Sequence, residues 1–291
     1  MLDYHLHLWP HGEQATEPTL EQLAAYCEKA TAVGVTEIAL TEHLFRFVQA
    51  DSALGGFWED DPNPALRPGM EAYWKAHATA DLDVYVETVL AAKSAGLPVV
   101  LGLEVDHYAG RMDQVAAVLD GYPFDVLLGS VHWIGSWGFD HYEDPVMDAE
   151  WDVRAIDDVW DAYTDCLEEL AESRVCDVLA HPDLCKITGR MPLVPDEFYD
   201  RMAEAAASSG MAAEVSSAGW RKPVGEAYPA PALLQRFGAR GVPVTTASDA
   251  HGLPLVADRI QDLRALLNDA GYDSLTAYRS RVPHAVPIGG L

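Results

Sequence analysis

Short apolar runs rich in β-branched residues alternate along this chain with longer segments in which apolar residues recur every three or four positions. The short runs predict seven strands, at 2–7, 36–41, 99–105, 126–130, 178–181, 213–217 and 244–248. The longer segments predict helices at 19–32, 82–94, 112–119, 155–173, 196–208 and 230–239. Such alternation is typical of βα units around a parallel sheet. A chain of 291 residues suits either one large α/β domain or two small ones, and one barrel-sized domain is favoured.

Two segments are longer than ordinary connections. Residues 44–80 and 133–154 carry many aromatic side chains among prolines and glycines. Long aromatic loops after strands often form lids or pocket walls, and simple packing against the rim of the barrel explains them equally well. Both are therefore expected to be rim loops.

Metal-capable side chains follow most of the predicted strands. The carboxyl ends of parallel barrel strands meet at one rim, so these side chains are expected to converge there. In chain order they are His5 and His7, Glu42 and His43, Glu104 and Asp106, His132, His181 and Asp183, and Asp249 and His251.

The spacing within these motifs favours a shared ion. His5 and His7 lie two residues apart on a strand and therefore point to the same face, and Asp249 and His251 repeat this spacing. Imidazole with carboxylate suits Zn, Mn or Fe. One such histidine alone is more often a core or rim residue, but six strand ends together predict a polynuclear metal site.

Composition narrows the possible partners. The chain has 291 residues and a formal charge of −27, which opposes binding to nucleic acid. The four cysteines show no CxxC spacing and are expected to be reduced thiols of a cytoplasmic protein. With no leader-like segment and no run of 18 apolar residues, no membrane partner is expected. A small molecule is the expected partner.

The order of these motifs resembles the polymerase and histidinol phosphatase (PHP) family. The resemblance runs through nearly the whole chain, and Trp137-Gly138-Phe139-Asp140 and Pro10-His11-Gly12 are similar to segments of its stand-alone histidinol-phosphatase branch. It implies a single domain over 1–291, a distorted (β/α)7 TIM-like barrel with two to three divalent metal ions at the C-terminal rim. The motifs that carry it are His5-Leu6-His7, Thr41-Glu42-His43, Gly102-Leu103-Glu104, Ser130-Val131-His132, Ala180-His181-Pro182 and Ser248-Asp249-Ala250-His251.

The resemblance also implies a ligand set in which Glu104 bridges two ions. Glu104, Asp249 and His251 are then the candidate catalytic residues. The first ion takes His5, His7, Glu104 and Asp249; the second takes Glu104, His132 and His181; the third takes His43, His251 and one ligand from the first loop.

The last ligand of the third ion is open. The family pattern expects a histidine eight residues after His5, where this chain has Glu13, while His11 stands two residues earlier in the expected Pro-His-Gly context. Either His11 reaches the metal from a shorter loop or Glu13 replaces it as an oxygen ligand; His11 is favoured.

The expected reaction is hydrolysis of a small phosphate monoester. Divalent ions lower the pKa of a bound water to about 7 and neutralise phosphoryl oxygens, so no protein nucleophile is needed. A cation that binds the phosphate is expected just after a strand end. Arg221 is favoured, because a guanidinium can contact two phosphate oxygens at once. The candidates are Arg221, Lys222, Lys186 and Arg46.

The resemblance makes L-histidinol phosphate the expected substrate. Its amine would need a negative charge, and the candidates are Asp140, Glu42 and Asp106. The alternatives are a phosphodiesterase or exonuclease of the same family, which the negative charge opposes, and a non-catalytic metal-binding barrel, which the complete ligand set opposes. An amidohydrolase-type enzyme would commonly use a bridging lysine, where this chain has Glu104.

Overall fold

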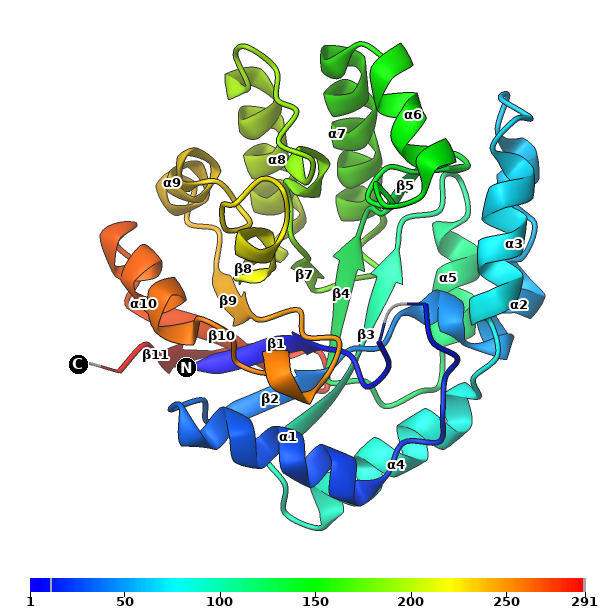
Figure 1. Cartoon of the computed structure of the whole chain (residues 1–291). Helices are drawn as coiled ribbons and strands as arrows, with labels where there is room; N and C mark the ends of the chain where they lie inside the picture. The colour runs from blue at the N-terminus through cyan, green and yellow to red at the C-terminus, as the bar shows by residue number, and fades with distance from the viewer. Residues whose placement is uncertain (11, 290–291) are drawn as a thin grey trace.

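The computed structural model describes residues 1–10 and 12–289, and its centre is one sheet of seven parallel strands (Figure 1). The strand order is β1-β2-β3-β4-β7-β8-β9, and every strand overlaps a predicted one. The prediction of a parallel α/β barrel is confirmed. The strands are β1 (Leu2–Leu6), β2 (Glu37–Leu40), β3 (Val99–Asp106), β4 (Val126–Ser130), β7 (Val178–Leu179), β8 (Ala212–Ser216) and β9 (Val244–Ala247).

The helices lie around the outside of this sheet (Figure 1). Their apolar stripes face the strands: Trp160, Tyr163 and Leu167, at helical spacing on α7, are all buried. All six predicted helices are present, each within one residue of its expected ends. They are α1 (Leu20–Ala32), α4 (Leu82–Ser94), α5 (Met112–Leu119), α7 (Ile156–Ser173), α8 (Asp196–Ser209) and α9 (Pro231–Ala239). Among the described residues, no helix has the length and apolarity needed to cross a membrane.

The segments 44–80 and 133–154, expected to be rim loops, contain helices and a short hairpin. The first segment folds into α2 (Val48–Leu54) and α3 (Arg67–His77), with short 3-10 turns at Leu44–Arg46 and Phe57–Asp60. The second folds into the hairpin β5 (Trp133–Ile134) and β6 (Trp137–Gly138), followed by α6 (Pro145–Val153). Prolines suggested loops, but in α3 and α6 they occupy the first helical turn, where their missing N–H costs nothing.

The chain after β9 forms elements that the sequence pattern did not predict. The helix α10 (Ile260–Asp269) leads into the antiparallel hairpin β10 (Ser274–Arg279) and β11 (Val282–Pro287). This hairpin contacts the residues just before two barrel strands: Arg281 pairs with Asp177 at 2.5 Å, and its backbone N–H donates to the carbonyl of Asp125. It therefore covers the amino-terminal end of the barrel, opposite the metal-capable side chains.

A buried carboxylate joins the last barrel strand to the first. One parallel backbone bridge connects Leu6 with Ala250. The carboxylate of Asp3 accepts hydrogen bonds from the backbone N–H and the hydroxyl of Ser248, both at 2.7 Å, and from the N–H of Ala257 at 2.8 Å. Asp3 thus fixes both ends of the loop that carries Asp249.

Replacing Asp3 with alanine is expected to lower the free energy of unfolding by about 2–4 kcal/mol, because three buried donors lose their acceptor. Urea denaturation measures this loss. Ser248→Ala, which removes one of the three bonds, should cost about 1 kcal/mol. Equal stability of Asp3→Ala and the wild type would contradict this account of barrel closure.

Candidate metal centre

Glu104 lies at the centre of the polar side chains on the carboxyl-terminal rim. It sits near the end of β3, is 1% exposed, and its backbone N–H donates to the carbonyl of Glu42 on the neighbouring strand end. Alternation along β3 points Gly102, Glu104 and Asp106 to the same face. Glu104 therefore projects into the barrel, where the other strand ends converge.

One carboxylate oxygen of Glu104 faces three histidines. Its Oε2 lies 2.8 Å from Nδ1 of His43, 3.1 Å from Nε2 of His5 and 3.4 Å from Nε2 of His7. These histidines come from the ends of β1 and β2, the two strands next to β3 on one side.

The other oxygen faces two histidines from the opposite side. Its Oε1 lies 2.9 Å from Nε2 of His181 and 3.3 Å from Nε2 of His132. These two follow β7 and β4 in the sheet. The two oxygens of Glu104 thus face two separate sets of imidazoles, which is the arrangement expected of a bridging carboxylate.

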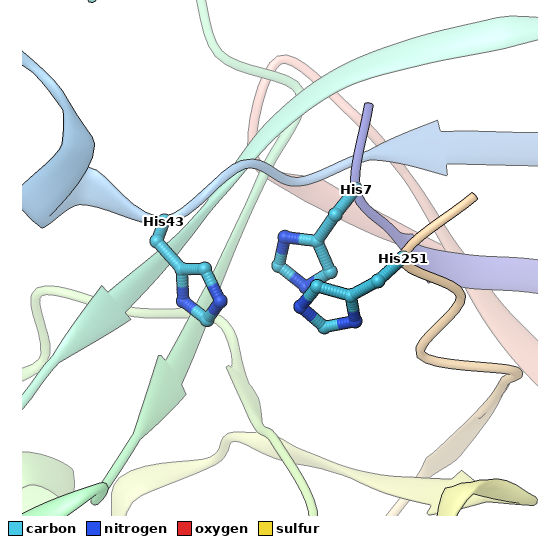
Figure 2. A group of neighbouring side chains, drawn as sticks. All are labelled: His7, His43 and His251. Atoms are coloured by element: carbon cyan, nitrogen blue, oxygen red, sulfur yellow. The ribbon is translucent and has the colours of Figure 1, made fainter. Parts of the chain in front are cut away.

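Asp249 and His251 bring the last strand to the same place. The Oδ1 atom of Asp249 lies 3.5 Å from Nε2 of His7, 3.9 Å from Nε2 of His5 and 3.5 Å from Nδ1 of His251. Figure 2 shows His7, His43 and His251 gathered around one space, and the rings of His43 and His251 lie 4.3 and 4.0 Å from that of His7. Asp249 has a φ of 49°, a left-handed conformation that aspartate tolerates better than most residues.

Among the described residues, ligand atoms within 4.8 Å of one another form four overlapping groups. His5, His7 and His43 each belong to two of these groups. The groups therefore describe one extended centre rather than separate sites. The groups are His7, His43 and His251; His5, Glu104 and His181; His5, His7 and Asp249; and His43, Asp106 and His132.

The donor set fits divalent transition-metal ions. The Nε2 atoms of His5 and His7 and the Oε2 atom of Glu104 are buried without a hydrogen-bond partner of acceptable geometry. Buried polar atoms without partners are costly, and imidazole nitrogens turned toward a carboxylate oxygen bind a cation well. A bound metal would satisfy all three atoms.

The electrostatics of the centre favour a cation. Burial alone would raise the pKa of Glu104, but His5, His43 and His132 outweigh it and hold that pKa well below its usual range. The pKa of Asp249 is held low in the same way, chiefly by His5. Both carboxylates therefore carry negative charge at neutral pH.

Two further carboxylates orient the histidines. Glu214 lies 2.7 Å from Nδ1 of His5 and also accepts the backbone N–H of His181 at 3.3 Å, while Asp106 lies 2.5 Å from Nδ1 of His132. Such partners fix the ring so that its other nitrogen faces the metal. Sequence reasoning missed Glu214; its signal was a lone acid inside the otherwise uncharged strand Ala212–Ser216.

The side chains of Glu42 and Arg46 hydrogen-bond the backbone of the loop that follows β1. Glu42 is fully buried and accepts the N–H groups of Leu8 and Trp9, and Arg46, 1% exposed, donates to the carbonyls of Pro10 and Glu13. Their hydrogen bonds shape the turn that follows β1. Neither side chain has surface available to a substrate.

The other candidate cations also differ in their surroundings. Lys186 is fully buried, 2.9 Å from Asp183 and 2.5 Å from Glu226. Arg221 donates to the carbonyls of Ser248 and Asp249 at 2.7 and 3.1 Å and pairs with Asp258 at 2.9 Å. Its charge thus supports the loop that carries Asp249.

Of the two candidates for the last ligand of the third ion, the structure describes only Glu13. Glu13 is exposed and belongs to none of the four ligand groups found among the described residues. His11 lies outside the described residues.

A cavity of about 420 Å³ opens from the metal-capable side chains. His43 and His132 line it, and the segments 44–80 and 133–154 supply most of its other lining residues. The lining residues include Phe45, Tyr73, His77, Trp133, Asp140, His141, Glu143, Asp144 and Lys222. Lys222 is the one lysine or arginine among the described lining residues.

Comparison with known proteins gives concordant matches. The PHP domain family matches residues 5–218. A probable histidinol-phosphatase from Deinococcus radiodurans is 36% identical over 230 residues, which cover 78% of this chain and 86% of that protein.

Two solved structures share the fold. One is the histidinol phosphate phosphatase of Lactococcus lactis, complexed with zinc, L-histidinol and phosphate; its TM-score is 0.70 at 18% identity, over 97% of this chain and 98% of that one. The other is the putative histidinol phosphatase of Listeria monocytogenes, with a TM-score of 0.71 at 17% identity over 90% of this chain and 99% of that one.

Replacing Glu214 with alanine is expected to weaken metal binding by about 10- to 100-fold, because His5 loses the carboxylate that orients it. Glu214→Gln should have a smaller effect, since its amide oxygen can still accept from His5. Metal retained after dialysis against graded chelator concentrations measures the change, with exposed Glu28→Ala as the control. Retention equal to that of Glu28→Ala would show that Glu214 does not support the centre.

Proposed function

Since this chain belongs to the PHP family, we propose that it is a metal-dependent phosphatase that hydrolyses L-histidinol phosphate to L-histidinol and phosphate. The observation that carries the proposal is the position of Glu104, with one oxygen facing His5, His7 and His43 and the other facing His132 and His181. The relative from Deinococcus radiodurans supports the substrate.

The proposed centre holds two to three divalent ions, of Zn, Mn or Fe. Glu104 would hold the first two ions together with the histidines that face its two oxygens. Asp249 would help to hold the first ion, and His43 and His251 would hold the third. Divalent ions so placed lower the pKa of a bound water to about 7 and neutralise the oxygens of a phosphoryl group.

The protein's own groups would position the reaction. Among the ligand candidates, Asp249 and His251 keep 17% and 13% of their side chains exposed, whereas Glu104 keeps 1%, so these two can meet a substrate from the solvent side. We infer that Glu104 holds the ions in place while Asp249 and His251 face the reacting phosphate. Glu214 and Asp106 keep His5 and His132 in the orientation that this requires.

We propose that Lys222 is the cation that binds the phosphate. It borders the cavity, whereas Arg221 is committed to Ser248, Asp249 and Asp258, and Lys186 to Asp183 and Glu226. Arg221 then serves the reaction by holding the loop of Asp249. Acidic residues dominate the charged part of the cavity wall, which favours a small monoester over a nucleic-acid end.

Purified protein loaded with Mn or Zn is expected to release phosphate from L-histidinol phosphate, and Glu104→Gln should lower kcat by at least about 100-fold because the bridge between the ions is lost. Phosphate release and elemental analysis measure activity and metal content together, with exposed Glu28→Gln as the control. Full activity of a metal-free protein would refute the mechanism. Cleavage of phosphodiesters without cleavage of monoesters would favour the nuclease alternative.

The two neighbouring cations should give different defects. Lys222→Ala is expected to raise KM and the inhibition constant of inorganic phosphate by about 10-fold with metal content unchanged, because one charged contact is lost. Arg221→Ala should instead lower metal content, because the carbonyl of Asp249 loses its donor. The reverse pattern, with metal retained in Arg221→Ala and phosphate affinity lost, would make Arg221 the phosphate ligand.

A further inference from the structure

Residues 140–144 line the cavity beside the metal centre, and hydrogen bonds fix the start of this segment in place. The N–H of His141 donates to the carbonyl of Gly138 at 3.1 Å, and the indole of Trp151 donates to the carbonyl of Phe139 at 3.0 Å. Phe139 is fully buried. The position of Asp140, between Phe139 and His141, is thereby set by the fold.

Asp140 presents an unsatisfied carboxylate to this cavity. Its Oδ1 atom is buried and has no hydrogen-bond partner among the described residues. The Nε2 atom of His141 lies 3.7 Å away, beyond hydrogen-bond distance. A buried carboxylate oxygen without a donor is costly, so this atom is well suited to a ligand that brings one.

The other acids of the same wall are less suited to that role. Asp144 caps α6 by accepting the N–H groups of Val146 and Met147 at 2.7 and 3.3 Å. Glu143 is exposed, so water screens its charge. Asp140 is therefore the carboxylate of this wall with both burial and free hydrogen-bonding capacity.

The cavity also offers aromatic surface next to Asp140. The ring of Tyr73 lies 4.1 Å from that of His77 and 4.5 Å from that of His141, and all three residues line the cavity. His43 and His132 of the metal centre line the same cavity. A ligand in the cavity can thus meet metal-capable histidines, a carboxylate and aromatic faces together.

We propose that Asp140 binds a protonated amine on the leaving-group side of the substrate and makes the enzyme selective for phosphate monoesters that carry an ammonium group close to the ester. The inference rests on the proposed phosphatase function and specifies its substrate class. A neutral or anionic leaving group leaves the buried Oδ1 of Asp140 unpaired, whereas an ammonium donates to it. L-Histidinol phosphate belongs to the favoured class, since its amine is on the carbon next to the ester methylene.

The test compares matched substrates that differ only in the amine. One pair is L-histidinol phosphate and its deamino analogue, 3-(imidazol-4-yl)propyl phosphate; the other is O-phosphoethanolamine and ethyl phosphate. In the wild type, kcat/KM should be higher for the amine of a pair. In Asp140→Asn, kcat/KM should fall by about 10- to 100-fold for the amine-bearing substrate of a pair. For the substrate without the amine it should fall by less than about threefold.

Two controls separate recognition from indirect effects. Glu143→Gln removes the same charge from the same wall and should keep the wild-type preference, and the metal content of Asp140→Asn should equal that of the wild type. An equal fall in kcat/KM for both substrates of a pair in Asp140→Asn would overturn the assignment. So would a loss of the preference for the amine-bearing substrate in Glu143→Gln as large as that in Asp140→Asn.

The design keeps the two proposals apart. Turnover of O-phosphoethanolamine without turnover of L-histidinol phosphate would reject the substrate proposed above, while the ratio within the second pair would still decide the role of Asp140. Hydrolysis of neither amine by metal-loaded wild type would overturn both proposals.

Discussion

The structure depends on placing one negative charge, that of Glu104, inside the barrel. A buried carboxylate is tolerated only when groups around it compensate its lost hydration. Here the compensation comes from five imidazoles on four strand ends, those of His5, His7, His43, His132 and His181. The parallel barrel brings these ends to one rim, so the fold and the metal-binding chemistry follow from the same constraint.

Around this centre, the protein uses most of its other buried charges to hold backbone in place. Asp3 and Arg221 fix the loop of Asp249 from two sides, and Glu42 and Arg46 shape the turn after β1. These contacts explain why ligand candidates on irregular segments can be held as firmly as those on strands. The cavity wall combines α3, the β5–β6 hairpin and the connection from β6 to α6, which hydrogen bonds hold in place.

The sequence was sufficient to predict the barrel and the convergence of the strand ends. Buried parallel strands read as apolar runs, so the end of each run is visible, and a histidine or carboxylate at that end projects to a known rim. Glu214 was not predicted as a site residue because it lies within a strand rather than at its end. The helices within 44–80 were not predicted because proline is common both in loops and in the first turn of a helix. Only packing distinguishes the two.

The roles of the cations could not be predicted, because they depend on partners far away in the chain. Arg221 and Lys222 are adjacent in sequence, yet the first is paired with Asp258 and the second borders the cavity. Nothing local to that segment distinguishes them. The same holds for Lys186, whose partner Glu226 is 40 residues away.

The central claim is that Glu104 bridges two metal ions. Anomalous diffraction from crystals of the metal-loaded protein tests this most directly, because it locates ions independently of activity. The account predicts one peak on each side of the Glu104 carboxylate, each about 2.0–2.2 Å from one of its oxygens and within reach of the histidines that face that oxygen. Active, metal-loaded crystals with no peak beside Glu104, or with both ions bound elsewhere, would contradict it.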